Sequence, residues 1–262
     1  MIEEMETLTM EVDNKVAYLT IQSPPANALS SKLIQAIGDK LTEIESKKDV
    51  KAVILKGEGR FFSAGADIKE FTSLQGADDY EALAKIGQDV FQIMETFHIP
   101  IIAAIHGASL GGGLEVALAC HMRIITKDAK IGLPEMSLGI IPGFAGTQRL
   151  PQYVGTAKAY EMILTAEPIS GEEAGRYGLA NHVMDTAEET LAKAEEIARK
   201  IAAKSGPTIH HVMELIPYTK TSQFDEGVAK EAKAFGEIFG TEDATEGIQA
   251  FIEKRQANFQ DK

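Results

Sequence analysis

The sequence predicts an α/β protein with two parts, an α/β core over residues 1–185 and a helical C-terminal region over residues 186–262. Two observations predict this organisation. In the first part, short apolar runs that end at glycine or proline alternate with helical periodicities, as buried strands and amphipathic helices do. The later part carries mainly helical periodicity, and no repeat, low-complexity tract or long linker separates the two parts. We therefore expect one core with a helical extension.

The first elements are predicted to form a hairpin. Residues 7–12 and 15–21 carry β-branched and aromatic side chains on either side of Asp13-Asn14, which is typical of two strands joined by a tight turn. Pro24-Pro25 ends the second strand, because proline has no N–H to donate to a strand ladder.

A helix and two buried strands follow the hairpin. Ser30 or Ser31 caps the helix. The apolar residues of this helix recur with a helical period: Leu33, Ile34, Ile37, Leu41 and Ile44. Residues 52–55 and 101–105 are short, wholly apolar runs typical of strands buried on both faces, and residues 78–97 between them are predicted as a helix.

Glycines mark the centre of the chain. Gly111-Gly112-Gly113 precedes an apolar helical stretch over Leu114–Cys120, and short strands are expected at 122–126 and 130–133. Residues 139–146 are rich in glycine and contain a proline, which predicts a loop with unusual backbone angles.

The C-terminal part begins its helices with recognisable caps. Ser170-Gly-Glu-Glu173 and Thr186-Ala-Glu-Glu189 both match the capping box. The buried face of the second helix is predicted from its spacing: Leu191, Ala194, Ile197, Ala198 and Ile201. Residues 224–259 are predicted as further amphipathic helices.

The charge balance excludes some classes of partner. The 262 residues include 26 Lys and Arg against 39 Asp and Glu, a net charge of −13. Nucleic acids and anionic membranes bind basic surfaces, so neither is an expected partner. No run is apolar for long enough to span a membrane. The acidic start and the single cysteine, Cys120, predict a cytoplasmic protein without disulfides.

Most familiar cofactor motifs are absent. Gly57-Glu-Gly59 follows a predicted strand, but Phe62 stands where a dinucleotide fingerprint needs its third glycine. The sequence contains no phosphate-binding G-x-x-x-x-G-K-[ST], no H-E-x-x-H and no C-x-x-C. We therefore expect neither a metal nor a redox cofactor.

One hydrolase motif is present. Gly107-Ala-Ser109-Leu-Gly111 is a G-x-S-x-G between a predicted strand and a predicted helix, the context of a serine nucleophile. Asp128 or Asp185, with one of the downstream histidines, would have to complete a triad. The alternative interpretation is that Ser109 is a small residue beside a tight turn.

Three segments together point to chemistry: 61–70, 106–115 and 133–150. The first two place small residues directly before an expected helix start, where backbone N–H groups are unpaired and the helix dipole is positive. Two such N–H groups aimed at one point would stabilise an oxyanion such as a thioester enolate. Glu115 lies just after the glycine run of the second segment, and Glu135 follows the end of a predicted strand in the third segment. Both carboxylates could reach one substrate.

At these residues the chain resembles the enoyl-CoA hydratase/isomerase (crotonase) superfamily, with the closest similarity to bacterial enoyl-CoA hydratases. The resemblance begins at Pro25-Ala-Asn-Ala-Leu29 and extends to Glu242-Asp-Ala-Thr-Glu-Gly-Ile-Gln-Ala-Phe251. It implies a spiral of β-β-α units with a helical C-terminal trimerisation region, assembled as a homotrimer or a hexamer. It also implies an acyl-CoA substrate and no cofactor.

The resemblance implies a role for each residue of the site. The N–H groups of Ala66 and Gly112 would hold the thioester oxygen. Glu115 would activate the water that attacks C3, and Glu135 would handle the proton at C2. Gly143 would help to hold the water through its N–H. Two glutamates favour hydration, because one must act on the nucleophile and the other on the carbon proton.

The resemblance also implies contacts to the substrate and to CoA. The matching positions are Ala28, Leu29, Ser63, Ala64, Ala66, Asp67, Ile68, Lys69, Gly111, Gly112, Pro134, Glu135, Phe251 and Lys254. Phe144 and Ala145 depart from the smaller residues of many relatives, so the acyl preference is open.

Other functions fit parts of the pattern. Within the family, the alternatives are a double-bond isomerase and an acyl-CoA hydrolase, since a fold alone does not fix a reaction. Outside it, the alternatives are a Ser109 hydrolase and an RNA-binding protein.

Overall fold

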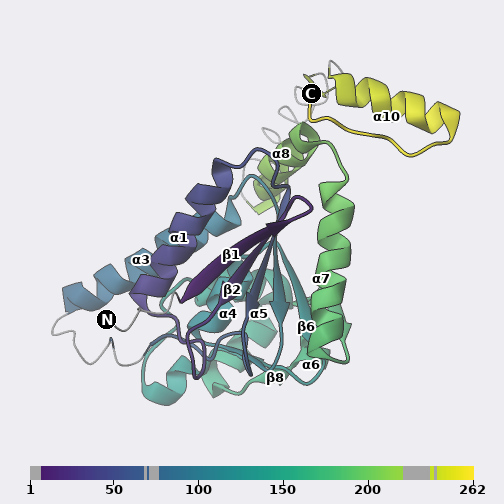
Figure 1. Ribbon diagram of the computed structural model, residues 1–262. Helices are drawn as coiled ribbons and strands as arrows, with labels where there is room; N and C mark the ends of the chain where they lie inside the picture. Colours follow the sequence, from purple (N-terminus) through teal and green to yellow (C-terminus); the bar gives the residue numbers. More distant parts are fainter. Residues whose placement is uncertain (1–6, 68–69, 71–76, 221–236, 239–240) are drawn as a thin grey trace.

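The computed structural model describes residues 7–67, 70, 77–220, 237–238 and 241–262. Its centre is a six-stranded sheet in the order β1-β2-β3-β4-β6-β9 (Figure 1). The bounds of these strands are β1 (Leu8–Asp13), β2 (Val16–Ile21), β3 (Ala52–Gly57), β4 (Ile101–Ile105), β6 (Met122–Thr126) and β9 (His182–Met184). The predicted α/β core is therefore confirmed, with each predicted buried strand in the sheet.

The hairpin is the antiparallel edge of an otherwise parallel sheet. β1 and β2 pair antiparallel with Asp13 opposite Val16, and the other neighbouring strands pair parallel. The turn residues are Asn14 and Lys15, one position later than predicted, with φ of 47° and 68°. Positive φ at both central residues matches the right-handed twist of the two strands.

Both faces of the sheet are covered, and its central strand β4 is apolar and buried at every position. Val53 and Leu55 of β3 face one core, whereas Ala52 and Ile54 face a second core. This alternation follows from the two-residue period of a strand.

Different helices cover the two faces (Figure 1). Helix α7 (Ala187–Ala202) closes the smaller core and places Ala194, Ala198 and Ala202 against the sheet. The opposite face is covered by α1 (Ser31–Glu45), α3 (Ala77–Glu95), α4 (Gly112–Ala119) and α5 (Gly146–Thr165). The alanines of α7 recur every fourth residue, which gives that helix a narrow flat face for close packing.

A smaller three-stranded sheet lies beside the start of α4. It consists of β5 (Ala108–Leu110), β7 (Lys130–Gly132) and β8 (Ile169–Ser170). Isolated bridges join Leu29 to Ala66 and Ser63 to Ser109, so the segment containing Ala66 continues this layer. These bridges fix residues 63–67 against residues 109–112, which positions the site described below.

The remaining helices are short or lie towards the C-terminus. They are η1 (Pro134–Leu138), α6 (Gly171–Arg176), α8 (Gly206–Leu215), η2 (Ile216–Lys220) and α10 (Glu242–Glu253). The predicted loop at 139–146 ends at Ala145, because α5 begins at Gly146. Part of the predicted helical stretch 224–259 lies outside the described residues. No helix in the described part of the chain is long and apolar enough to cross a membrane.

The end of the chain returns to the core. α10 lies apart from the sheet in Figure 1, and the segment after it runs back towards α8. There the carboxylate of Asp261 accepts the N–H of Gly206 at 2.8 Å and pairs with the buried Nζ of Lys51 at 2.5 Å. Lys51 also donates to the carbonyl of Lys204 at 2.6 Å. A buried lysine without such partners would be strongly destabilising.

Candidate active site

A cavity of about 660 Å³ lies between α3, the start of α4, η1 and the loop before α5. Its polar side is formed by two carboxylates and by main-chain groups of small residues. Its apolar side is formed by Tyr80, Leu83 and Ala84 of α3 and by Leu138, Ile140, Ile141 and Phe144. A mostly apolar cavity with a few convergent polar groups is the usual form of a small-molecule site.

Two main-chain N–H groups are free to bind a ligand in this cavity. Ala66 lies between Gly65, whose carbonyl accepts from Leu29, and Asp67, whose N–H donates to Leu29. Since successive residues of a strand point in opposite directions, the N–H of Ala66 points away from Leu29. Gly112 is the first residue of α4, where an N–H has no acceptor within the helix.

The two N–H groups belong to neighbouring backbone segments. A methyl group on Gly112 would stand 3.4 Å from the nitrogen of Ala66. Within the described residues, neither of these N–H groups donates a hydrogen bond to another main-chain group. A glycine at position 112 thus leaves open the space in which one oxyanion could accept from both groups.

Glu115 is held firmly in the first turn of α4. Its side chain is buried, with the residue 2% exposed. Oε1 accepts the N–H groups of Phe144 and Gly146, each at 2.8 Å. A side chain on Gly146 would collide with Glu115, since its Cβ would stand 2.9 Å from Oε1. Main-chain donors from the loop before α5 therefore fix the orientation of this carboxylate.

Burial strongly affects the ionisation of Glu115. Loss of hydration, and then the charge of Glu135, raise the pKa of Glu115 to about 7, although the N–H groups of Gly146 and Phe144 oppose this rise. A carboxyl group with this pKa exchanges protons readily at neutral pH.

Glu135 faces the same cavity from η1. Pro134 precedes it at the start of this short helix and fixes the backbone there. Burial raises the pKa of Glu135, and its Oε2 is buried without a hydrogen-bond partner in the described part of the chain. Oε1 lies against Gly111, where a Cβ would stand 2.9 Å from it. Gly111 also has a positive φ of 51°. Glycine is therefore required here both by the backbone conformation and by the close approach of Glu135.

An ion pair between the buried Arg149 and the half-buried Glu95 supports the loop that holds Glu115. Nη1 of Arg149 donates to the carbonyl of Phe144 at 3.0 Å, while Nε pairs with Glu95 of α3 at 2.9 Å. The loop is thus fixed through the N–H of Phe144 on one side and through its carbonyl on the other. Arg149 and Glu95 are 54 positions apart in the sequence, so no local pattern predicts their contact.

The structure brings most of the expected site residues together. Those that line the cavity are Ala64, Ala66, Gly111, Gly112, Glu115, Pro134, Glu135 and Gly143. Leu29, Ser63 and Asp67 lie directly behind them: Leu29 is bonded to Gly65 and Asp67, and the hydroxyl of Ser63 donates to Asn27. Ala28, next to Leu29, is half-buried.

The structure places the other four expected residues neither in the cavity wall nor directly behind it. Ile68 and Lys69 lie outside the described residues, and so does the side chain of Phe251, whose backbone belongs to α10. Lys254 is exposed at the end of α10 and is not among the residues that line the cavity. The apolar residues of α3 were not named as site residues, because residues 71–90 carry no recognisable specificity signature.

Ser109 is not placed as a nucleophile. It lies within β5, is fully buried, and its hydroxyl donates to the carbonyl of Gly113 at 2.9 Å. A serine nucleophile needs an exposed hydroxyl on a sharp turn. The structural interpretation of the G-x-S-x-G motif therefore holds, and the Ser109 hydrolase does not fit this geometry.

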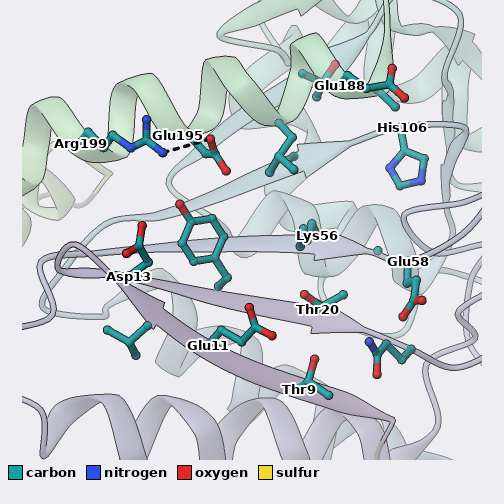
Figure 2. Close-up of a pocket in the computed structure, with 18 residues that line it drawn as sticks. Thr9, Glu11, Asp13, Thr20, Lys56, Glu58, His106, Glu188, Glu195 and Arg199 are labelled. Atoms are coloured by element: carbon teal, nitrogen blue, oxygen red, sulfur yellow. Dashed lines mark hydrogen bonds and ion pairs between the residues drawn. The ribbon is translucent and has the colours of Figure 1, made fainter.

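A second cleft, of about 720 Å³, lies on the outer face of the sheet beside α7 (Figure 2). Its charged side chains are mainly acidic: Glu11, Asp13, Glu58, Glu188 and Glu195, against Lys56 and Arg199. Arg199 is also paired with Glu195. Such a surface disfavours an anion, and neither Glu115 nor Glu135 lines it. No group of side chains suited to a metal ion occurs within the described residues.

Comparisons with known proteins agree with this geometry. The family model described as Enoyl-CoA hydratase/isomerase matches residues 11–262. A probable enoyl-CoA hydratase of Bacillus subtilis is 54% identical to this chain, and the alignment spans 97% of this chain and 99% of the relative. A short-chain-enoyl-CoA hydratase of Clostridium acetobutylicum is 40% identical, with 97% of each chain covered. The crystal structure of an enoyl-CoA hydratase from Bacillus anthracis is 34% identical, with a TM-score of 0.92 over 98% of this chain and 100% of its own.

Proposed function

The chain belongs to the enoyl-CoA hydratase/isomerase family, and we propose on this basis that it is an enoyl-CoA hydratase of fatty-acid metabolism. It is a hydro-lyase that adds water across the C2–C3 double bond of a 2-trans-enoyl-CoA and yields a 3-hydroxyacyl-CoA. The observation that carries the proposal is the convergence of Glu115 and Glu135 on one cavity with the N–H groups of Ala66 and Gly112.

These groups support a complete reaction. Ionised Glu115 takes a proton from water, whose oxygen forms a bond to C3. The π electrons of the double bond move to C2 and onto the thioester oxygen, which accepts from Ala66 and Gly112. Neutral Glu135 then gives its proton to C2, and transfer of a proton from Glu115 to Glu135 restores the starting state. The N–H of Gly143 is proposed to hold the water.

Burial raises the pKa of both carboxyl groups, because it disfavours the charged form of each. One buried cavity favours a single negative charge over two, so one group stays neutral while the other is ionised. The cycle uses no metal and no redox cofactor, and acyl-CoA enters only as substrate.

The assembly is proposed to be a homotrimer or a hexamer. α10 lies apart from the sheet (Figure 1). Its side chains Ile248 and Ile252 are exposed. Apolar side chains exposed on a projecting helix are typical of an interface. A cytoplasmic location is also proposed, and the buried free thiol of Cys120 is compatible with it.

Hydration of crotonyl-CoA tests the function directly. We expect rapid loss of the enoyl-thioester absorbance with 3-hydroxybutyryl-CoA as product. Glu115→Gln and Glu135→Gln should each lose at least about a hundredfold in kcat, as expected for groups that transfer protons. Glu167→Gln, which changes an exposed glutamate that does not line the cavity, is the matched control.

Product analysis separates the alternatives. A shifted double bond would identify an isomerase, and free CoA would identify a hydrolase. Full activity of both cavity variants would overturn the proposal.

A further inference from the structure

The ring of Phe144 fills one end of the cavity. Phe144 is 5% exposed and lines the cavity between α3 and the start of α4. A methyl group on Gly112 would stand 3.2 Å from Cε2 of the ring, and one on Gly87 would overlap the opposite edge of the ring. The ring is therefore held between two glycines, one of them beside the proposed oxyanion site.

Helix α3 is shaped to accept this ring. Gly87 lies well inside α3, where glycine is less favourable than alanine for helix stability. The space that an alanine methyl would occupy is taken by Phe144. One turn later, Phe91 packs edge-to-face against the same ring, with the two centroids 5.6 Å apart. Phe144 therefore packs against both Gly87 and Phe91 of α3, and the absence of a side chain at Gly87 makes room for its ring.

The ring also lies next to the reacting atoms. The N–H of Phe144 binds Glu115, which acts at C3, and its ring contacts Gly112, which binds the thioester oxygen. The acyl chain beyond C3 consequently meets the ring, or it turns towards the opening between α3 and residues 138–141. Leu138 and Ile141 at this opening are 60% and 69% exposed.

We propose that Phe144, seated against Gly87, limits the cavity to short acyl groups such as crotonyl. This inference rests on the proposed hydratase function. A short alkyl group is buried against Phe144, Leu83 and Ala84. A long chain has to leave the cavity, and its additional methylenes gain little burial for their length.

Chain-length preference in two variants tests the proposal. In the wild type, kcat/KM for trans-2-decenoyl-CoA should be below that for crotonyl-CoA. Phe144→Ala opens the space beside Gly87, so the ratio of decenoyl to crotonyl kcat/KM should rise about tenfold or more, since one methylene in an apolar pocket is worth roughly 10–200-fold in discrimination. Phe144→Leu should give an intermediate ratio and remains informative if the alanine variant folds poorly.

Phe91→Leu is the matched control. Phe91 belongs to the same aromatic pair but does not line the cavity. Its replacement loosens the packing without opening the acyl site, so the ratio should stay within about twofold of the wild type. An equal rise in Phe91→Leu would show that loosened packing, rather than the ring of Phe144, sets the preference, and would overturn the proposal.

Binding of unreactive saturated thioesters separates this proposal from the hydratase function. Calorimetry with butyryl-CoA and decanoyl-CoA should show that Phe144→Ala strengthens decanoyl-CoA binding relative to butyryl-CoA. This shift in a protein that fails to hydrate crotonyl-CoA would support the size limit while the hydratase function fails. An unchanged binding ratio together with an unchanged kinetic ratio would overturn the size limit and leave the hydratase function intact.

Discussion

Arg149 donates to the carbonyl oxygen of Phe144 at 3.0 Å, while the N–H of Phe144 donates to Glu115 at 2.8 Å. The peptide groups on the two sides of Phe144 thus connect a buried cation to a buried carboxylate. The charge of Arg149 also favours the ionised form of Glu115, although burial has the larger effect on its pKa.

Arg149→Met should lower both stability and activity. The change removes the ion pair to the half-buried Glu95 and the hydrogen bond to the carbonyl of Phe144, and it should lower the free energy of unfolding by about 1–3 kcal/mol. Loss of the positive charge should raise the pKa of Glu115, so the acidic limb of the kcat/KM–pH profile should move to higher pH. Urea unfolding and pH profiles measure the two effects. Arg149→Met with Glu95→Gln should recover part of the stability but not the profile, and an unmoved limb would contradict the electrostatic role.

Glu115→Gln should abolish hydration and yet stabilise the protein at alkaline pH. The pKa of Glu115 rises from 4.5 in the unfolded chain to about 7 in the folded protein. The folded state therefore binds more protons between these values, and the contribution of Glu115 to stability falls as the pH rises through this window. Above pH 7 the ionised group costs on the order of 3 kcal/mol, which glutamine avoids while its carbonyl still accepts both N–H groups.

Urea unfolding at pH 5 and pH 8 measures this difference. The variant should exceed the wild type at pH 8, and the gain should shrink at pH 5. A variant that is less stable at pH 8 would show that the buried amide costs more than the buried charge.

Gly112→Ala should leave the fold intact and remove most of the activity. Alanine is favourable in the first turn of a helix, but its methyl group would stand 3.4 Å from the nitrogen of Ala66, where the thioester oxygen is expected. Loss of oxyanion stabilisation lowers kcat by about a hundredfold. Steady-state kinetics and thermal unfolding together check this, with Ala117→Gly in the same helix as a packing control. Unchanged kcat would remove Gly112 from the proposed oxyanion site.

Ala145→Gly should stabilise the protein. Ala145 precedes α5 with φ of 70° and ψ of 24°, a left-handed conformation that is costly for any residue with a Cβ. Relief of this strain, reduced by the greater freedom of glycine in the unfolded chain, should gain about 0.5–1 kcal/mol. Ala203→Gly, where φ is −78°, should instead destabilise. Chemical denaturation compares the two, and equal losses would argue against strain at Ala145.

The sequence predicted elements whose signals are local. The run Ala52–Leu55 and the spacing from Leu33 to Ile44 each predicted an element that the structure contains. The glycines at 111 and 112 and the glutamates at 115 and 135 stood out by their position at expected helix starts and strand ends, whereas their assignment to one site came from the resemblance to a known family. The roles of these residues remain predictions for the kinetic experiments above.

Other features depend on contacts that no local pattern encodes. Ser109 occupies a strand because β7 pairs with its segment, although its motif also matched a strand-to-helix turn. Gly87 resembles an unfavourable helix residue until the ring of Phe144 is seen beside it. The pairing of Lys51 with Asp261 joins opposite ends of the chain. In each case the partner is distant in sequence, and only the fold reveals it.

Most of the polar groups around the cavity belong to the main chain: the N–H groups of Ala66, Gly112, Phe144 and Gly146. Mutation replaces side chains but leaves these groups in place, provided that the loop geometry survives. Selection can therefore exchange Glu115 or Glu135 and redirect the chemistry while anion binding is inherited unchanged. Among the described residues, the site thus combines a fixed main-chain anion site with two carboxylates that substitution can change.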